Sequence, residues 1–376
     1  MTALRVAIVG CGKIADQHVW GIKRINFAEI VGVCDQEVLM AEQMAERFSV
    51  PHVSADLGQL LTEARPDVVH ITTPPQSHFA VAAQCLEAGC HVYVEKPFTL
   101  NTDDAVRLIR IAQHRNLKIT VGHNLQFAWE NAQARALVKA GYLGGPPVHI
   151  ESYYTYGFGD DGYAKALLGD RNHWVRRLPG KLLHNVISHG IARIAEYIEA
   201  EVPFVSAFGY SSPLLVRIGA SDVVDELRVH ISDGANMTAA FVFSSQLSPP
   251  MNGFRIYGPR NSLVVDNVHH TVTRSELRGF KSYANYVIPP ALMAREYLRS
   301  SRRNIGRFLR SDFHDDSGIK NLVEAFYRSV LGEAPLPIGY AEILRTSRIM
   351  DAIFQQLSSG AVPIQDSLDE PAKVEA

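Results

Sequence analysis

A glycine turn near the start of the chain, set between an apolar strand and a helix, is the feature that most restricts how this sequence can fold. The apolar run Leu4 to Val9 ends in Gly10-Cys11-Gly12-Lys13-Ile14-Ala15. In such a turn the first glycine permits the tight bend, the second lets a pyrophosphate approach the backbone, and the small third residue allows the helix to pack closely on the strand. We therefore predict a dinucleotide site formed by Gly10, Gly12, Lys13, Ile14 and Ala15.

An acidic residue at the end of the next strand supports this interpretation. The strand Glu29 to Cys34 ends in Asp35, twenty positions after Ala15. At this spacing a carboxylate binds the ribose hydroxyls of the adenosine. Because the same carboxylate would repel a 2′-phosphate, the expected cofactor is NAD rather than NADP.

Strands and helices continue to alternate through the first third of the chain. The pattern predicts helices at 37–48, 57–64, 77–87 and 102–115, and strands at 52–53, 68–72, 91–94 and 118–121. Alternation of this kind implies right-handed crossovers and an open parallel sheet.

The strand 91–94 is followed by Glu95-Lys96-Pro97, at the edge where open parallel sheets bind ligands. Lys96 is either a contact to the reacting groups or an ordinary exposed lysine at a strand end. The strand 68–72 is followed by a stiff loop that holds Thr73, Pro74 and two further polar residues, Ser77 and His78. Ser77 can cap the next helix, and His78 either contacts a ligand or is a capping or surface residue.

The second half of the chain predicts a different arrangement. Strand-like segments occur at 148–155, 204–210, 225–231, 237–243, 253–257 and 263–265, with turns at Asp233-Gly234 and Gly258-Pro259. Strands linked by hairpins form an antiparallel sheet. A helix is predicted over 182–194, on which Asn185 and His189 stand four residues apart and so share one face.

Five motifs in this order and spacing resemble those of the glucose–fructose oxidoreductase / inositol dehydrogenase / MocA family, over nearly the whole chain. They are Gly10-x-Gly12-x-x-Ala15, Asp35, Thr73-Pro74-Pro75-x-x-His78, Glu95-Lys96-Pro97 and Gly122-His123-Asn124. The resemblance implies an α/β fold, with an N-terminal Rossmann domain that binds NAD(P) and a C-terminal α/β domain with a large open, mostly antiparallel sheet. It also implies oxidoreduction of sugar or polyol hydroxyls by a homo-oligomer, a dimer or tetramer.

The resemblance further implies roles for single residues. Lys96 would contact the substrate hydroxyl and the nicotinamide ribose, and His189 lines up with the catalytic histidine of the family. The other cofactor contacts that it implies are Thr73, Pro74, His78, Glu95 and Asn124.

Three positions depart from the family pattern, among them Gln126, where many relatives carry Arg. Asn185 stands where relatives carry an acid, and Arg193 where an aspartate often follows the histidine. An amide can hold a hydroxyl but cannot take a proton, so we expect His189 to act as the base, with Lys96 assisting and Asn185 positioning the sugar ring. The alternatives are a structural histidine within a helix core and a cofactor-bound regulator without turnover.

A basic cluster precedes the predicted catalytic helix and consists of Arg171, His173, Arg176, Arg177 and Lys181. Arginine forks suit phosphates and carboxylates, which favours a nucleotide sugar or an acidic sugar as substrate. On this hypothesis Arg171, Trp174 and Arg176 join Lys96, Asn185 and His189 in the substrate site. The alternative is that the cluster faces solvent.

The charge balance of 37 basic and 39 acidic residues argues against a nucleic-acid-binding protein. No signal peptide and no long apolar run is found, so we expect a cytoplasmic protein. Its four cysteines lack CxxC pairing and are expected to be reduced and mostly buried. His269 and His270 are adjacent on a predicted strand and point to opposite faces, so no metal site is expected.

Arginines interleaved with apolar residues over 291–310 predict a basic amphipathic helix, which is either solvated or contacts a membrane surface or an anionic partner. The predicted domains are 1–123 for NAD(P) binding and 124–360 for the substrate and for oligomerisation, and a flexible tail is predicted at 361–376. The predicted function is hydride transfer between NAD and a secondary hydroxyl or ketone of a sugar. The alternatives are a sugar-modifying enzyme that uses tightly bound NAD without net redox, and the regulator.

Overall fold

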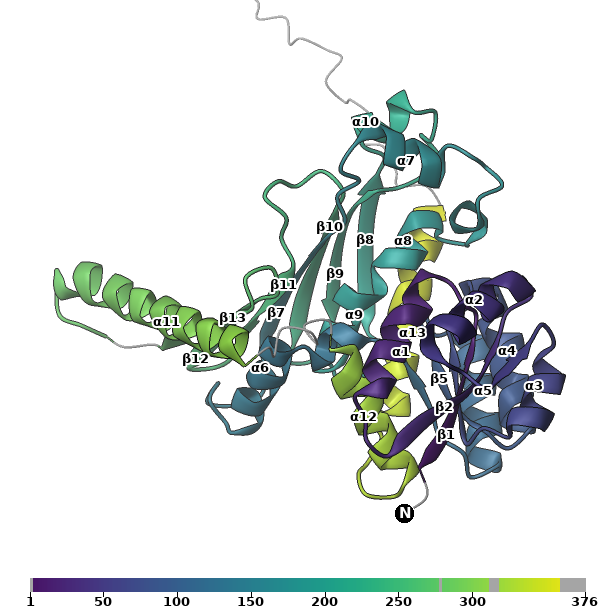
Figure 1. The fold of residues 1–376 in the computed structure, drawn as a ribbon. Coiled ribbons are helices and arrows are strands. Elements are labelled where there is room, and N and C mark those ends of the chain that lie inside the picture. Colours follow the sequence, from purple (N-terminus) through teal and green to yellow (C-terminus); the bar gives the residue numbers. More distant parts are fainter. Residues whose placement is uncertain (1–2, 277–278, 311–317, 359–376) are drawn as a thin grey trace, which may run out of the picture.

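The computed structural model describes residues 3–276, 279–310 and 318–358. The predicted tail at 361–376 therefore lies outside the described residues. Two sheets organise the chain, one in each half (Figure 1).

The first sheet has six parallel strands in the order β3-β2-β1-β4-β5-β6. The strands are β1 (Leu4–Val9), β2 (Ala28–Cys34), β3 (His52–Ser54), β4 (Val68–Ile71), β5 (His91–Val94) and β6 (Ile119–Val121). The helices between them are α1 (Lys13–Lys23), α2 (Val38–Phe48), α3 (Leu57–Ala64), α4 (His78–Glu87) and α5 (Thr102–His114). The order reverses beside β1, and ligands bind at the carboxyl ends of the strands next to such a switch point.

The second sheet has seven strands in the order β13-β12-β11-β7-β10-β9-β8, and all its pairs are antiparallel except β7 with β10. The strands are β7 (His149–Thr155), β8 (Phe204–Tyr210), β9 (Glu226–Ser232), β10 (Thr238–Ser244), β11 (Gly253–Tyr257), β12 (Asn261–Asp266) and β13 (Thr271–Glu276). The predicted fold class is thereby confirmed. The edge strand β13 was not predicted.

The helices of the second half are α6 (Trp129–Lys139), α7 (Asp161–Leu168), α8 (Lys181–Val186), α9 (Ser188–Ala195), α10 (Pro213–Arg217), α11 (Ala284–Leu309), α12 (Ile319–Val330) and α13 (Tyr340–Ser358). Short 3₁₀ turns occur at Pro75–Ser77, Asn124–Phe127 and Trp174–Arg177.

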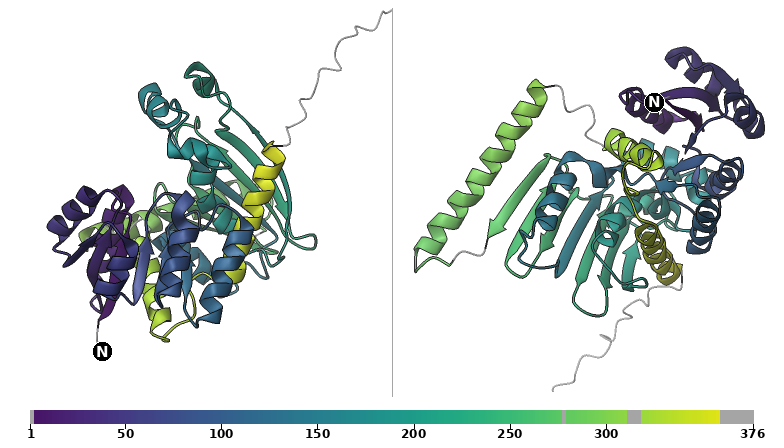
Figure 2. Two further views of the ribbon diagram at one scale, coloured as in Figure 1. Left: turned by 90° about the vertical axis from the view of Figure 1, so that its right-hand side faces the viewer. Right: turned by 90° about the horizontal axis from the view of Figure 1, so that it is seen from below.

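Helix α12 returns to the first sheet and packs on α1, beside it in Figure 1. Its residues Leu322, Val323, Phe326 and Tyr327 are fully buried in the core of the first sheet. Helix α13 contacts α5 on one side and α9 and β8 on the other (Figure 2). The predicted boundary after residue 123 stays a prediction, and the first core also includes this late segment.

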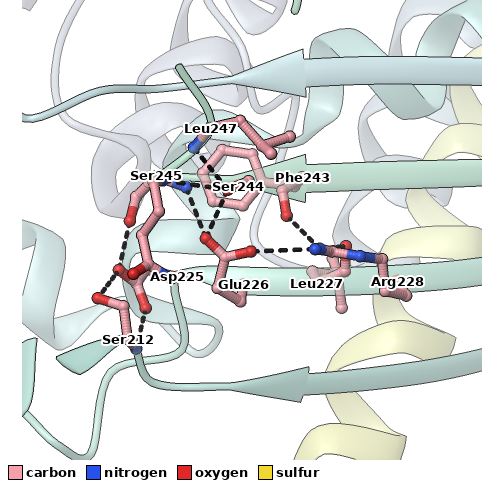
Figure 3. Close-up of polar contacts among 10 residues, drawn as sticks. Ser212, Asp225, Glu226, Leu227, Arg228, Phe243, Ser244, Ser245 and Leu247 are labelled. Atoms are coloured by element: carbon pink, nitrogen blue, oxygen red, sulfur yellow. Dashed lines mark hydrogen bonds and ion pairs between the residues drawn. The ribbon is translucent and has the colours of Figure 1, made fainter. Parts of the chain in front are cut away.

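Two buried carboxylates stabilise the β9–β10 hairpin (Figure 3). Asp225 accepts hydrogen bonds from the hydroxyls of Ser212 and Ser245, and Glu226 accepts from the Ser244 hydroxyl at 2.6 Å and from Arg228 at 3.2 Å. Burial of a charge is tolerated only when it is paired or hydrogen-bonded, and both groups meet this condition. They are therefore part of the fold and not free for chemistry.

Across 3–276, 279–310 and 318–358, no group of three or more histidine, cysteine or acidic side chains is placed to hold a metal ion. Within the same ranges, no helix is both long and apolar enough to cross a membrane. All four cysteines are buried free thiols. Burial raises the pKa of Cys34 and of Cys90 to about 11, so both stay protonated at neutral pH.

Candidate active site

The glycine turn after β1 has the two properties that a dinucleotide site requires. Gly10 has φ of +95°, and a Cβ there would lie 2.7 Å from the amide nitrogen of Thr73, so no other residue fits. Gly12 precedes α1, and a Cβ on it would meet no atom within 4 Å. No side chain caps this helix, so its first N–H groups remain available to a phosphate. Lys13 and Ile14 form the first turn of α1, with Lys13 exposed, and Ala15 is buried beneath it.

Asp35 is held beside this turn by the backbone. Its carboxylate accepts the N–H of Cys11 at 2.7 Å and the N–H of Glu37 at 2.9 Å. Since β1 and β2 are neighbours, the end of β2 brings the acid next to the glycines, as the spacing in the sequence predicted. A nucleotide pyrophosphate at α1 and a ribose at Asp35 are compatible with these positions.

The loop after β4 supports the turn from below. The hydroxyl of Thr72 donates to the carbonyl of Gly10 at 2.5 Å. His78 is buried, with Nδ1 2.8 Å from the carbonyl of Pro97 and Nε2 2.9 Å from that of Thr73. Its ring therefore joins this loop to the one after β5. Ser77 does not cap α4 with its side chain, contrary to expectation, because its hydroxyl bonds to Thr73 instead.

Glu95 and Lys96 follow β5 at the same edge. Glu95 is buried, and its Oε2 accepts the N–H of Lys96 at 3.1 Å. Burial alone would raise the pKa of this carboxyl, but the hydrogen bond from His18 and the charge of Lys96 bring it below its ordinary value. Burial lowers the pKa of Lys96, and Glu95 opposes that shift. Lys96 is thus a partly enclosed cation with an anion next to it.

The second domain contributes the junction between α8 and α9. The predicted single helix over 182–194 is wrong in one respect, because it breaks at Ile187, where a 3₁₀-type bond joins the Gly190 N–H to the Ile187 carbonyl. Close packing accompanies the break, since a Cβ on Gly190 would lie 2.1 Å from the ring of Phe241. Asn185 and His189 therefore lie on two successive short helices, α8 and α9.

The break exposes a carbonyl that meets Lys96. Carbonyls in the last turn of a helix have no partner within it. The Lys96 Nζ donates to the carbonyl of Asn185 at 2.8 Å, across the two domains. Lys96 thus contacts the backbone of Asn185 and not its side-chain amide. No sequence pattern indicated this backbone contact.

Two histidines lie together near this junction. His123 follows β6, and its ring centroid lies 6.3 Å from that of His189. In the described part of the chain, no hydrogen-bond partner is found for either ring nitrogen of His123 or for Nδ1 of His189. Burial lowers the pKa of His123 to about 4, and burial with the charge of Lys96 holds the pKa of His189 well below its ordinary value. Both rings are neutral at pH 7 and able to accept a proton.

His123 is not among the site residues predicted from the sequence. Its position directly after a parallel strand is the signal that would have found it. Asn124, which was selected, begins the 3₁₀ turn that follows, and it is half-buried. Arg193 lies one turn after His189, is buried, and lowers the pKa of His189 further.

The basic cluster is only partly available to a ligand. Arg176 is buried and forms an ion pair with Asp222 at 2.9 Å, and Lys181 also pairs with Asp222. Arg171 and Arg177 are exposed, while His173 and Trp174 are half-buried with their rings 5.8 Å apart. The carbonyl of Trp174 accepts the amide of Gln76 at 2.9 Å, which places this segment against the loop after β4.

A family description of oxidoreductases with an NAD-binding Rossmann fold, GFO_IDH_MocA, matches residues 4–123. Among curated relatives, D-glucoside 3-dehydrogenase of Escherichia coli is 34% identical over 142 residues, 38% of this chain and 40% of that protein. UDP-N-acetylglucosamine 3-dehydrogenase of Acidithiobacillus ferrooxidans is 35% identical over 126 residues, 33% of this chain and 38% of that protein. The alignments thus span less than half of either relative.

Among solved structures, the WlbA dehydrogenase of Bordetella pertussis in complex with NADH and UDP-GlcNAcA has a TM-score of 0.75. The match covers 96% of this chain and 97% of that one at 15% identity. It shows that both domains share that fold.

Proposed function

We propose that this chain, whose residues 4–123 match the description of the GFO_IDH_MocA oxidoreductase family, is an NAD-dependent dehydrogenase or reductase acting on a secondary hydroxyl or ketone of a sugar. The observation that carries the proposal is the convergence of Lys96 with the α8–α9 junction. The Nζ of Lys96 reaches Asn185 at 2.8 Å, at the strand edge that also holds the glycine turn. This contact supports the proposal because it sets the Lys96 ammonium beside the segment that carries the neutral imidazole of His189.

The residues fit NAD, which would supply the acceptor for a hydride. Gly10, Gly12 and the first turn of α1 would hold the pyrophosphate, and Asp35 would hold the ribose hydroxyls. Further contacts to the cofactor would come from Thr73, Pro74, Glu95 and Asn124. The carboxylate of Asp35 disfavours a 2′-phosphate, which supports NAD over NADP.

His189 and Lys96 divide the proton chemistry in this proposal. Loss of a hydride from a carbinol requires loss of the hydroxyl proton, and the neutral His189 ring can accept it. Lys96 would orient the hydroxyl by donating a hydrogen bond. Its ammonium is already directed by the Asn185 carbonyl, so little reorganisation is needed.

The substrate class in the proposal is a nucleotide sugar or an acidic sugar. Two curated or solved relatives named above act on or bind UDP-linked sugars. Arg171, Arg177 and Trp174 remain as contacts, whereas Arg176 and Lys181 are paired with Asp222. Arg176 therefore acts by supporting this segment and not as a direct ligand.

The test follows NADH absorbance while NAD or NADP is presented with UDP-, GDP- and dTDP-sugars, free sugars and inositols. We expect turnover with NAD and a nucleotide or acidic sugar, and a loss of about 10²- to 10⁴-fold in kcat for His189→Asn with an unchanged Tm. Equal turnover of neutral free sugars and their nucleotide forms would contradict the substrate class. No change in NADH absorbance with any substrate, together with NAD that stays bound through purification, would favour a reaction without net redox or a regulatory protein.

The proposal includes a homo-oligomer. Strand β8 presents Phe204, Phe208 and Tyr210 on one exposed face, and exposed aromatic patches mark contact surfaces. Light scattering after gel filtration tests it, and a monomer at micromolar concentration would contradict it. The four free thiols fit the predicted cytoplasmic location, because disulfides are rare in that compartment.

The proposal also includes contact of α11 with an anionic membrane surface. Figure 1 shows α11 extending to the left beyond the edge strand β13. One side packs on β13 and α6, where Glu296 pairs with Arg274 and Arg299. The other side exposes large apolar residues: Tyr286, Val287, Met293, Tyr297, Leu298, Ile305, Phe308 and Leu309.

The charges on α11 indicate which kind of partner contacts this exposed side. Glu296 is the only acidic residue in 281–310, and its carboxylate is already paired with Arg274. Arg295 and Arg302 are exposed among the apolar side chains. A second copy docking through the same face would bring arginine against arginine. An anionic lipid surface satisfies both the charge and the apolar side chains.

Co-sedimentation with vesicles of phosphatidylcholine, with and without about 30% phosphatidylserine, tests this contact. We expect binding only to the anionic vesicles, falling by roughly tenfold for the triple variant Tyr286→Ser, Tyr297→Ser, Phe308→Ser. The matched control is Leu39→Ser with Val216→Ser, which removes exposed apolar side chains from α2 and α10. Equal loss in both variants would contradict the proposal, and a change of oligomeric state in the triple variant alone would indicate self-association instead.

A further inference from the structure

A line of four buried polar side chains crosses the core of the first domain and ends next to Lys96. Glu95 Oε1 lies 3.0 Å from His18 Nε2, the Nδ1 atoms of His18 and His70 are 2.8 Å apart, and His70 Nε2 lies 2.8 Å from the hydroxyl of Tyr327. Glu95 directly follows β5, and the other three residues come from α1, β4 and α12 in turn. His18, His70 and Tyr327 have no exposed surface.

We propose that His18, His70 and Tyr327 are positioning residues that hold Glu95 ionised and oriented as the counter-charge of Lys96. The inference rests on the proposed function, in which Lys96 orients the reacting hydroxyl. It adds three residues, one of them from the last part of the chain, to the control of that lysine.

The hydrogen bonds can run in only one direction if every polar hydrogen is used. A carboxylate only accepts, so His18 donates from Nε2, and its Nδ1 accepts from Nδ1–H of His70. Nε2 of His70 then accepts from the hydroxyl of Tyr327. The reverse direction at His70 would leave the buried tyrosine proton without an acceptor, at a cost of one unsatisfied group. All donors therefore point toward Glu95.

Stability alone does not account for this arrangement. Replacing a buried polar network by apolar side chains of similar volume is often neutral or stabilising. The surroundings are otherwise apolar, since β4, β5 and α12 contribute Val69, Val92 and Phe326 to the same core. The network instead fits a requirement for a fixed anion at one point of the strand edge.

The groups that face Glu95 are consistent with that role. From α1 it meets His18, from its own strand end Lys96, and after β6 it meets Gly122, where a Cβ would lie 2.6 Å from Oε1. Burial lowers the pKa of His78, the first residue of α4, and of His123, and the charge of Glu95 opposes both shifts. Loss of its negative charge would lower the pKa of Lys96 further, because burial would then act unopposed.

Two tyrosines on the same histidine provide a matched pair for the test. Tyr327 is hydrogen-bonded to His70, whereas Tyr93 stacks on His70 with ring centroids 4.6 Å apart, and its hydroxyl has no partner in the described part of the chain. Both are fully buried. Tyr327→Phe and Tyr93→Phe therefore remove the same atom next to the same ring, but only the first breaks the line.

The experiment measures kcat and kcat/KM against pH for both variants, with Tm recorded at each pH. In Tyr327→Phe we expect the acid limb of the kcat–pH profile to move to higher pH by about 0.5 to 1 pH unit, with little change in KM. Tyr93→Phe should retain the wild-type profile. Equal profiles in the two variants, or a lower Tm of Tyr327→Phe with an unchanged profile, would overturn the inference.

A readout that needs no turnover separates this inference from the proposed function. ¹⁵N spectra of imidazole-labelled protein should show neutral His70 protonated at Nδ1 and His18 protonated at Nε2. The resonance of His70 Nε2 should shift in Tyr327→Phe, which removes the donor to that nitrogen, and should be unchanged in Tyr93→Phe. The opposite tautomer of His70 in the wild type would overturn the inference even if a substrate is found. The expected tautomers in a protein without turnover would leave the hydrogen-bonded line supported and refute the enzymatic function alone.

Discussion

Gly10 and Gly12 stand two positions apart in one turn, and their surroundings separate a folding role from a binding role. Gly10 has a positive φ and lies against the backbone of Thr72 and Thr73, directly after the neighbouring strand β4. Gly12 has φ of −75°, which any residue adopts, and open space around it. A glycine that is not required by its backbone or its neighbours is explained by a ligand that approaches it closely.

Substitution of each glycine by alanine should divide these roles. Gly10→Ala places a Cβ 2.7 Å from the Thr73 nitrogen and should lower the free energy of unfolding by about 2–4 kcal/mol. Gly12→Ala should leave the denaturant midpoint within experimental error and weaken NAD binding by at least tenfold, measured by quenching of protein fluorescence. Wild-type NAD affinity in Gly12→Ala would argue against a pyrophosphate at this helix.

At the scale of elements, a buried acidic junction joins α13 to α9 and to the 3₁₀ turn Asn124–Phe127. Gln126 donates to Glu342 at 2.7 Å and to Glu196 at 3.2 Å, and Arg135 pairs with Glu196. Burial and the neighbouring Glu196 raise the pKa of Glu342 from 4.5 to about 7. Glu196 and Glu342 thus share the positive charge of Arg135, and the carboxyl group of Glu342 remains protonated up to neutral pH.

The pH dependence of stability should reflect this proton. Between pH 4.5 and about 7 the unfolded chain loses the proton of Glu342 while the folded chain keeps it, so the free energy of unfolding falls as the pH rises. The shift corresponds to at most about 3 kcal/mol. Glu342→Gln keeps an acceptor for Gln126 and removes the ionisation, so it should raise Tm at pH 8 and have little effect at pH 4.5. A stabilisation that is equal at both pH values would contradict the assignment.

At the scale of the whole molecule, the chain folds back on itself so that the second domain is inserted between parts of the first. Helix α12 fills a groove beside α1, and Phe326 and Tyr327 are fully buried there. The same helix supplies the tyrosine that ends the line of buried polar side chains at His70. Completion of the nucleotide domain therefore depends on residues about 200 positions beyond its last strand.

Expression of residues 1–123 alone should demonstrate this dependence. Without α12 the apolar side of α1 is exposed, and the fragment should aggregate or unfold well below the Tm of the full chain. Phe326→Ala in the full chain should cost about 3–5 kcal/mol, measured by denaturant unfolding. A monomeric fragment that melts cooperatively near the Tm of the full chain would show that the groove needs no cover.

The sequence alone determined the features that depend on near neighbours. The limits of α3 and of β5 agree with prediction, because periodicity, Gly and the N-cap Asp56 act within a few residues. The same holds for the turn Gly10 to Ala15 with Asp35, because two adjacent parallel strands end at one edge. That edge was therefore predictable, and so was the position of Lys96 on it.

Only the tertiary structure decided what those residues meet. The helix break at Ile187 accompanies the contact of Gly190 with Phe241, which lies some fifty positions further along the chain. Asp222 neutralises Arg176 and Lys181 from a distant loop, and the tyrosine bonded to His70 comes from α12. Contacts of this kind join segments brought together by the packing of two sheets, and no local pattern of residues contains them. The chemistry of the site depends on both: the sequence selects the groups, and the packing sets their charges and partners.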